Sequence, residues 1–294
     1  MPDREAEKTV WEVAVTVHRE VAELVLLRLW EESPSGFEER TKGDHVTYVL
    51  YFDADHGPPS AFTVRLEQRL EAFEPDIQVC CRPVRDWIEV SKSHFKPLEI
   101  GTLRIVPPWE RSGRPDELVI APGMAFGTGM HESTRLALRL VMAACDEATP
   151  SSVIDVGCGT GILALAALKM GALRAVACDI DSAAIKAAEE NAKANGLLDR
   201  LTLKVCDLAE MTGEPAYPMV IANMTIDLLG RFFQQLTALT EPGGILILSG
   251  LYHSQLTRIV SAFPSPHWST VKRYHEGCWE AISLRREGAT ACRE

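Results

Sequence analysis

Apolar and polar residues alternate with two different periods over the first third of the chain. A period of two, typical of half-buried strands, occurs at residues 11–17, 45–52 and 77–84. Helical spacing, with apolar residues three and four positions apart, occurs between them at residues 19–32 and 60–73. The pattern therefore predicts strands that alternate with amphipathic helices.

The loop before the second strand has room for a short additional strand at residues 37–40. The predicted order β-α-β-(β)-α-β is that of a small ferredoxin-like α+β domain, which we place at residues 1–85. This segment contains no nucleophile, metal-ligand cluster or glycine-rich loop, so we expect it to recognise a substrate. Residues 86–100 are predicted to form a linker helix that Pro97 ends.

From residue 101 to 288 the pattern becomes α/β, and a short tail at 289–294 follows. Helices are predicted at 133–145, 161–171, 182–196, 226–239 and 252–263, and strands at 152–157, 174–181, 200–207, 217–224 and 243–250. Two further strands, with Gly277 between them, end the series. The alternation predicts a doubly wound, mostly parallel sheet, and the final pair implies one antiparallel strand inserted at an edge.

The composition narrows the possible partners. The 294-residue chain has a formal net charge of −11, and because an acidic surface repels phosphate backbones, a basic protein partner is favoured over nucleic acid. It has no signal-peptide pattern and no apolar stretch long enough to cross a bilayer, so we expect a cytoplasmic protein without membrane contact. We also expect a monomer. The eight cysteines form no C-x-x-C pair, so we expect buried free thiols and no metal site.

The sequence "DVGCGTG" predicts a glycine-rich turn between a strand and a helix. Gly157 allows a tight exit from the strand, and Gly159 lets the backbone approach a ligand closely. In the dinucleotide-binding fingerprint the third glycine follows the second by three residues, whereas Gly161 follows Gly159 by two. The turn is therefore predicted to bind a nucleoside rather than a dinucleotide.

Polar residues end the next strands of the predicted sheet, where parallel sheets bind their ligands. Asp179 could accept hydrogen bonds from the two hydroxyls of a ribose; the alternative is a helix cap, which Asp181 or Ser182 can provide instead. Asp207 could reach an adenine amino group or lie in a solvated loop. Asn223 could present its carbonyl oxygen to an amine or to a cofactor, or bond the local backbone.

A second glycine-rich stretch, "APGMAFGTGMHEST" at residues 121–134, precedes the predicted sheet. Its glycines, Gly127 among them, would let a flexible segment fold over one end of a ligand. Phe126 could exclude water from that ligand, and Thr128 lies in the same segment. Two hydroxyl residues are candidates for the cap of the following helix: Ser133 and Thr134.

"DVGCGTG", "CDID" and "ANM", in this order, resemble the motifs of S-adenosylmethionine-dependent methyltransferases of the seven-stranded Rossmann-like class. The stretch "APGMAFGTGMHESTRLAL", together with "HFKPLEIG", "RIVPPWE" and "EPGGILILSGLYHSQ", is similar to the methyltransferases of large-subunit ribosomal protein eleven. By motif, the resemblance covers about residues 85–285.

The resemblance implies cofactor contacts from Thr134, Gly157, Asp179 and Asn223. It also implies methylation of lysine side chains and of the N-terminal amine of the ribosomal protein, with recognition by the N-terminal domain. Lysine methyltransferases of an electron-transfer flavoprotein share the catalytic pattern and are an alternative. The remaining residues that we assign to the S-adenosylmethionine site are Phe126, Gly127, Thr128, Gly159 and Asp207.

Methyl transfer to an amine requires positioning more than a strong base. The methyl group of a sulfonium is already activated for in-line displacement. A lysine amine, with a pKa of about 10.4 in water, loses its proton more readily when it is buried near a positive charge. We therefore assign Asn223 as the catalytic residue that orients the amine or the cofactor, and interpret His131 as structural.

The fourth-strand run "NMTI" lacks the prolines and the aromatic residue that methyltransferases of adenine and planar amides carry there, which favours a flexible alkyl amine as substrate. Other functions stay open at this point. Another protein or a small-molecule amine could be the substrate. A dinucleotide-dependent oxidoreductase is disfavoured by the glycine spacing and by the lack of a catalytic Tyr-Lys or Cys-His set. A non-catalytic nucleoside-binding module would have no use for the polar Asn223.

Overall fold

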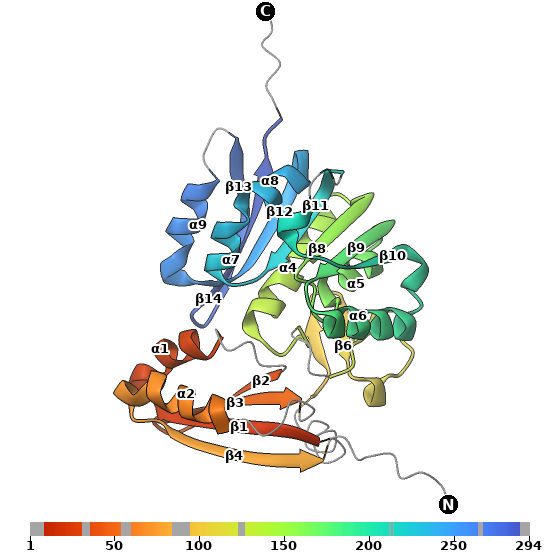
Figure 1. Ribbon diagram of the computed structural model, residues 1–294. Coiled ribbons are helices and arrows are strands. Elements are labelled where there is room, and N and C mark those ends of the chain that lie inside the picture. Colours follow the sequence, from red (N-terminus) through yellow and green to blue (C-terminus); the bar gives the residue numbers. More distant parts are fainter. Residues whose placement is uncertain are drawn as a thin grey trace, which may run out of the picture. The chain divides into compact units, whose positions relative to one another are not determined.

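The computed structural model divides the chain into two compact units, Met1–Phe95 and Lys96–Glu294 (Figure 1). It describes residues 9–30, 36–53, 60–83, 95–122, 127–211, 213, 215–263 and 267–288. The second unit begins at Lys96, within the segment predicted as a linker.

The first unit contains one antiparallel sheet with the strand order β2-β3-β1-β4. Its elements are β1 (Thr9–His18), α1 (Arg19–Trp30), β2 (Gly36–Lys42), β3 (His45–Asp53), α2 (Ser60–Leu70), the 3-10 turn η2 (Glu71–Phe73) and β4 (Asp76–Pro83). These elements lie where the apolar pattern predicts them, and β2 is the additional strand.

Both helices cover one face of this sheet. Val15 of β1 is buried and lies opposite Tyr48 of β3, so both side chains point to the same face. The Tyr48 hydroxyl donates a hydrogen bond of 3.0 Å to the carbonyl of Ala22 in α1. At its other end α1 is joined to α2, because Arg28 donates a bond of 2.8 Å to the carbonyl of Arg69.

The second unit opens with a three-stranded sheet that the apolar pattern did not predict as a sheet. It consists of β5 (Leu98–Ile100), β6 (Leu103–Val106) and β7 (Glu117–Val119), with the 3-10 turn η3 (Pro108–Glu110) after β6. The last residues of the predicted linker, residues 98–100 after Pro97, form a strand that pairs antiparallel with β6. Residues 84–94 lie outside the described part of the chain.

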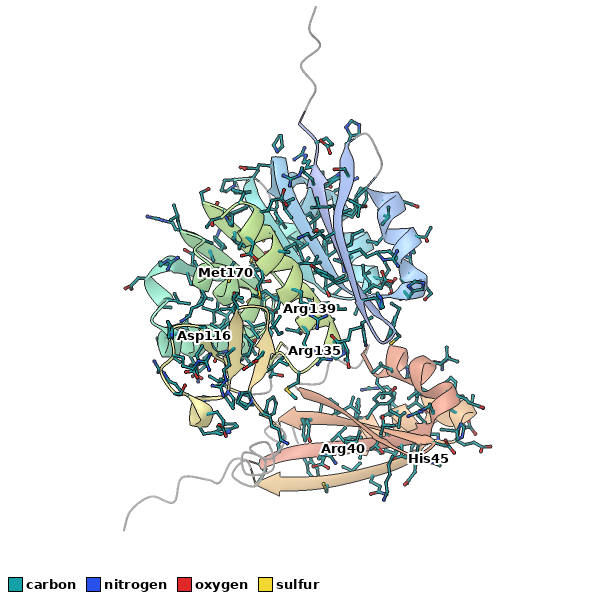
Figure 2. All side chains as sticks on the ribbon, turned by 180° about the vertical axis from the view of Figure 1, so that it is seen from behind. Arg40, His45, Asp116, Arg135, Arg139 and Met170 are labelled. Carbon is teal, nitrogen blue, oxygen red and sulfur yellow. The ribbon has the colours of Figure 1, made fainter. Side chains whose placement is uncertain are left out.

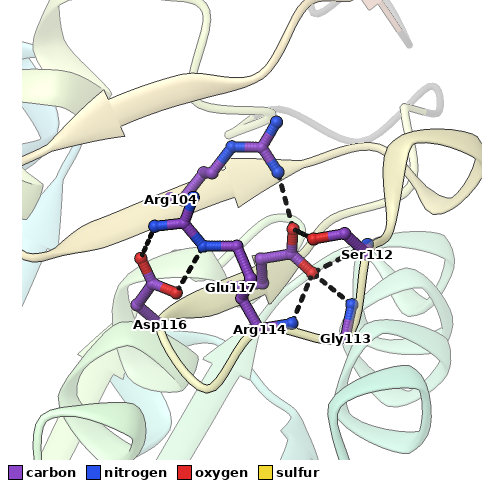
Figure 3. A network of polar contacts seen from close by, with 6 residues as sticks. All are labelled: Arg104, Ser112, Gly113, Arg114, Asp116 and Glu117. Atoms are coloured by element: carbon purple, nitrogen blue, oxygen red, sulfur yellow. Dashed lines mark hydrogen bonds and ion pairs between the residues drawn. The ribbon is translucent and has the colours of Figure 1, made fainter.

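A buried carboxylate closes the loop between β6 and β7 (Figure 3). Glu117 is 3 % exposed and accepts hydrogen bonds from the Ser112 hydroxyl at 2.6 Å and from the N–H groups of Ser112, Gly113 and Arg114 at 2.9, 2.8 and 3.2 Å. The carboxylate oxygen that accepts from the Ser112 hydroxyl also forms an ion pair of 2.6 Å with Arg104. The Ser112 hydroxyl, the backbone donors and Arg104 together lower the pKa of Glu117 to about 2.

The large sheet of the second unit has the strand order β10-β9-β8-β11-β12-β14-β13. Its strands are β8 (Ser152–Val156), β9 (Arg174–Asp179), β10 (Leu201–Val205), β11 (Tyr217–Asn223), β12 (Thr240–Tyr252), β13 (Trp268–Glu276) and β14 (Trp279–Arg286). Neighbours from β10 to β12 are parallel, and β14 is antiparallel to both β12 and β13. From β8 the chain adds β9 and β10 on one side of the sheet and then returns to add β11 on the other side of β8. The strand order therefore reverses between β8 and β11, although these two strands are parallel. Sheets of this kind bind ligands at such a point.

Helices cover both faces of this sheet. They are α4 (Glu132–Glu147), α5 (Ile162–Lys169), α6 (Ser182–Asn195), α7 (Ile226–Arg231), α8 (Phe233–Leu239) and α9 (Leu256–Ala262), with 3-10 turns η4 (Leu198–Arg200), η5 (Leu208–Glu210) and η6 (His253–Gln255). Figure 1 is seen from the side of α7, α8 and α9, and Figure 2, from behind, shows α4 with Arg135 and Arg139 on the opposite face. The single helix predicted over 226–239 is wrong, because Phe232 leaves the helical conformation (φ −107°, ψ 15°) and separates α7 from α8.

All cysteines in the described part of the chain are free thiols, but only Cys145, Cys158 and Cys178 are buried. The expectation of buried thiols is therefore wrong for Cys81, which is exposed at the edge strand β4. Among the described residues, no helix combines the length and the apolar character needed to cross a membrane.

We predict that Glu117→Gln lowers the melting temperature at pH 7 by about 5 °C, because the amide nitrogen of glutamine meets backbone donors that need an acceptor. The low pKa of Glu117 places its stabilisation above pH 4.5, and this stabilisation is lost as pH falls towards 2. The difference between wild type and variant should shrink over that range in thermal denaturation. Glu99→Gln, at an exposed position of β5, is the control, and equal melting of the two variants would contradict the assignment.

Candidate functional site

The turn between β8 and α5 is built by glycines with positive φ. Gly157, Gly159 and Gly161 have φ values of 67°, 52° and 75°, in the region that side-chain-bearing residues rarely adopt. The N–H groups of Gly157 and Cys158 both donate to the carbonyl of Cys178 at the end of β9, at 2.8 and 3.0 Å. Gly157 is exposed whereas residues 158–160 are buried, so the turn presents backbone without a side chain at the carboxyl edge of the sheet.

Asp179, at the end of β9, is bonded to this turn. One carboxylate oxygen accepts from the N–H of Gly159 at 2.9 Å, and the other accepts from the N–H of Asp181 at 3.0 Å. Asp181, not Asp179, caps α6, because its carboxylate accepts from the N–H of Ala183 at 2.8 Å. The structure thus removes the helix-cap alternative for Asp179 and leaves its remaining lone pairs at the sheet edge.

Asp207 follows β10 at the same edge, where Val205 is the register partner of Asp179. Its carboxylate accepts from the N–H of Ala209 at 2.9 Å and caps η5. Ile180, directly after Asp179, is 71 % exposed and was not among the residues predicted from the sequence. The available signal was an apolar residue between the two aspartates of "CDID".

Asn223 and Thr134 come together from positions 89 residues apart. Asn223 ends β11 and donates through its amide nitrogen to the hydroxyl of Thr134 at 3.4 Å. Thr134 is fully buried in the first turn of α4. Because the amide nitrogen faces Thr134, the carbonyl oxygen of Asn223 is directed away from it. A Cβ at Gly250 would lie 2.6 Å from the Met224 carbonyl oxygen and 3.2 Å from the Asn223 carbonyl oxygen, so this position beside Asn223 requires glycine.

The second glycine-rich stretch lies against the glycine turn. The carbonyl of Gly127 accepts a short hydrogen bond from the Thr160 hydroxyl. Two features favour glycine at position 127. Its φ of 95° is rarely adopted by other residues, and a Cβ there would lie 3.1 Å from the Thr160 hydroxyl oxygen. Thr128 is half-buried, and Phe126 belongs to residues 123–126, which lie outside the described residues.

His131 caps α4, so the predicted cap by Ser133 or Thr134 is wrong. The helix begins at Glu132, and the Nδ1 atom of His131 accepts from the N–H of Ser133 at 3.2 Å. Ser133 and Thr134 lie inside the first turn, buried against the sheet. Burial lowers the pKa of His131 to about 4, which keeps the imidazole neutral and its Nδ1 free to accept.

The first turn of α4 is also fixed to the hairpin β13–β14. The His131 ring packs edge-on against Trp279, with ring centres 4.5 Å apart. Arg135, labelled in Figure 2, donates to Glu276 at 3.0 and 2.7 Å and also bonds the carbonyl of Met130. These contacts hold the end of the glycine-rich stretch in one place, and no sequence motif indicated them.

Asp155 lies beneath the glycine turn, within β8. It is fully buried; one oxygen accepts from the N–H of Ala164 at 3.1 Å, and the other has no hydrogen-bond partner among the described residues. Burial raises the pKa of Asp155 to about 7. Asp155 is thus a buried carboxyl group beneath the turn that holds its proton more readily than in water.

The structure therefore brings most of the predicted site residues to the carboxyl ends of β8, β9 and β11. These strands lie on both sides of the point where the strand order reverses. A doubly wound sheet with a glycine turn on its first parallel strand and a carboxylate ending the second defines a nucleoside-binding α/β protein. Together with the polar Asn223 beside Thr134, it is the arrangement of an S-adenosylmethionine-dependent methyltransferase.

Comparison with known proteins gives the family. The profile of the ribosomal protein L11 methyltransferase (PrmA) family matches residues 10–287. A ribosomal protein L11 methyltransferase of Geobacter metallireducens is 38 % identical over 236 residues, which are 79 % of this chain and 71 % of the relative. That of Deinococcus radiodurans is 34 % identical over 272 residues, 88 % of this chain and 93 % of the relative. This chain belongs to the ribosomal protein L11 methyltransferase family.

A solved structure supports the same assignment. The ribosomal protein L11 methylase of Lactobacillus delbrueckii subsp. bulgaricus superposes with a TM-score of 0.59 at 30 % identity. The similarity covers 66 % of this chain and 100 % of that chain.

The residues present fit S-adenosylmethionine. The cofactor carries a positive sulfonium and an amino group, and the sheet edge offers the carboxylate of Asp179 and the amide oxygen of Asn223. Gly157 has φ 67°, and a Cβ there would lie 3.1 Å from the terminal methyl of Met224, so this position favours glycine.

We predict that Asp155→Asn changes how stability depends on pH. Because the folded-state pKa is raised from 3.8 to about 7, the folded protein keeps a proton that the unfolded chain loses between these values. Wild-type stability should therefore fall as pH rises from about 4 to 7, by at most about 1.4 kcal/mol per pH unit from this group. The variant should lack that fall in urea denaturation at several pH values. Asp146→Asn, at an exposed position of α4, is the control, and parallel profiles for wild type and Asp155→Asn would refute the claim.

Proposed function

We propose that this chain transfers methyl groups from S-adenosylmethionine to lysine side chains and the N-terminal amine of ribosomal protein L11. The observation that carries the proposal is the family match over residues 10–287, which includes both units and not only the cofactor-binding sheet. Relatives at 34–39 % identity bear the same name. The alternatives of an electron-transfer flavoprotein substrate or a non-catalytic module are not favoured by any of these matches.

We assign the nucleoside end of the cofactor to the glycine turn and its neighbours. Asp179 has lone pairs for the ribose hydroxyls after its two bonds to backbone N–H groups. Gly157 and Gly159 allow the ligand to approach the backbone, and the exposed Ile180 offers an apolar surface beside Asp179. Asp207 has one oxygen occupied as the cap of η5, and its proposed role is a bond to the adenine amino group.

The methionine end is assigned to Thr134, Asn223 and the stretch that contains Phe126, Gly127 and Thr128. When bound, S-adenosylmethionine supplies a methyl group that is already activated by its sulfonium. The chain then has to hold a neutral amine in line with it. The Asn223 amide nitrogen is committed to Thr134, so its carbonyl oxygen is the group that accepts from the amine and orients its lone pair.

No strong general base is needed for this role. Burial next to a positive charge lowers the pKa of a lysine amine and favours the neutral nucleophile. His131 is not assigned as the base, because its Nδ1 accepts from the Ser133 N–H as the cap of α4. Asn223 cannot accept a proton, which fits an orienting residue.

The finer assignments of fold and partner are part of the proposal. The order β10-β9-β8-β11-β12-β14-β13 supports the seven-stranded methyltransferase sheet, and the antiparallel β2-β3-β1-β4 sheet with its helices supports a ferredoxin-like first domain. We propose that this first domain recognises the substrate. The net charge of −11 suits a basic ribosomal protein. A cytoplasmic, monomeric enzyme stays a prediction of the sequence.

We predict that Asn223→Ala lowers kcat by about 100-fold, because the amine loses its orientation, while the Kd for S-adenosylhomocysteine changes by less than about threefold. Steady-state kinetics and calorimetric binding separate the two quantities. Equal losses in turnover and in cofactor affinity would refute an orienting role.

The substrate assignment is tested by incubating the full chain with S-adenosylmethionine and purified large-subunit proteins. Intact-protein mass spectrometry should show that L11 alone gains multiples of one methylene. Peptide mapping should place the gain on lysines and the N-terminal amine. Methylation of another protein, or cofactor binding without any transfer, would contradict the proposal.

A further inference from the structure

We infer that Asn191 and Thr160 are positioning residues that fix the second glycine-rich stretch to the glycine turn and thereby set the affinity for the cofactor. The inference rests on the proposed function, because it concerns the site in which S-adenosylmethionine binds. Asn191 is 2 % exposed on α6, and Thr160 is fully buried in the turn, so neither side chain offers a surface to a ligand.

The two residues form a continuous series of hydrogen bonds. The N–H of Ala121 donates to the Asn191 carbonyl oxygen at 2.9 Å, and the Asn191 amide nitrogen donates to the carbonyl of Thr160 at 3.0 Å. The Thr160 hydroxyl donates to the carbonyl of Gly127. Ala121 and Gly127, on the two sides of residues 123–126, are thus both tied to Thr160.

Only an amide satisfies the Asn191 position. Its oxygen must accept and its nitrogen must donate in opposite directions, so aspartate would keep the bond from Ala121 and lose the donor to Thr160. The site is buried, and a lost partner would leave a backbone group without a hydrogen bond.

The contact between α6 and the turn is too close for other residues to replace these bonds. A Cβ at Gly161 would lie 2.9 Å from the Cβ of Ala188, which is one helical turn before Asn191 on the same face of α6. A Cβ at Gly127 would lie 3.1 Å from the Thr160 hydroxyl oxygen. The helix, the turn and the glycine-rich stretch therefore meet with no room for a compensating side chain.

This arrangement matters because the two ends of the site belong to separate segments. The turn is bonded to Asp179 through Gly159, whereas the glycine-rich stretch leads to Thr134 and its bond to Asn223. A ligand that contacts both the glycine turn and the glycine-rich stretch requires these two segments to lie at a fixed distance from each other. Without the Asn191–Thr160 bonds, part of the binding free energy would be spent on ordering the stretch.

The chain contains a matched control one helical turn further along α6. Asn195 bonds the N–H and the carbonyl of Val119 at 2.8 and 2.7 Å. It fixes the end of β7 in the same way and also donates to the backbone carbonyl of Asn191 at 2.8 Å. Among the described residues, its bonds go to Val119 and Asn191 and not to the glycine turn.

The test measures the Kd of S-adenosylhomocysteine by calorimetry on the full chain, together with the melting temperature. Asn191→Asp and Thr160→Val should each raise Kd by about tenfold or more. The double variant should raise it by less than the product of the two, because both break one series of bonds. Thr160→Ser, which keeps the hydroxyl, should restore binding close to that of wild type.

Asn195→Asp should lower the melting temperature while Kd changes by less than about twofold. Unchanged Kd in Asn191→Asp and Thr160→Val, or an equal rise in Asn195→Asp, would overturn the inference while leaving the proposed function in place. Failure of the wild-type chain to bind S-adenosylhomocysteine would overturn the proposed function, and the inference with it.

Discussion

The hydrogen bond from the Gly159 N–H to the Asp179 carboxylate joins the ends of β8 and β9, and the rest of the site depends on it. It exists only because the turn after β8 adopts positive φ at Gly157, Gly159 and Gly161, a path closed to residues with a Cβ. The same turn leaves Gly157 exposed and brings Thr160 under the second glycine-rich stretch. One backbone constraint therefore positions both Asp179 and the second glycine-rich stretch, the two parts to which we propose to assign the two ends of the cofactor.

Buried polar groups hold the other parts of the second unit in register. Neutral His131 caps α4 and packs on Trp279. The Ser249 hydroxyl donates to the carbonyl of Ser133 at 2.8 Å and joins the first turn of α4 to β12. The Ser249–Ser133 bond is buried, so leaving it unmade would be costly. This explains how a stretch rich in glycine can lead into a fixed position of Thr134 beside Asn223.

The sequence predicted local elements well where periodicity was strong. The strands and helices of the first unit, and the α/β series of the second, follow from apolar spacing and glycine placement. It failed where long-range pairing decided the outcome. Residues 98–100 became a strand because β6 was available as a partner. The cap of α4 is His131 because the helix begins at Glu132, which places the His131 Nδ1 within reach of the Ser133 N–H.

The sequence by itself indicated the family, because its glycine-rich motifs resemble those of the methyltransferases whose profile matches residues 10–287. It could not determine which residues touch one another. The Asn223–Thr134 bond spans 89 residues, and the series from Ala121 through Asn191 and Thr160 to Gly127 joins segments of three different elements. Such contacts depend on how α4 and α6 pack against the sheet, and packing is set by the shapes of buried side chains, which no local pattern of residues records.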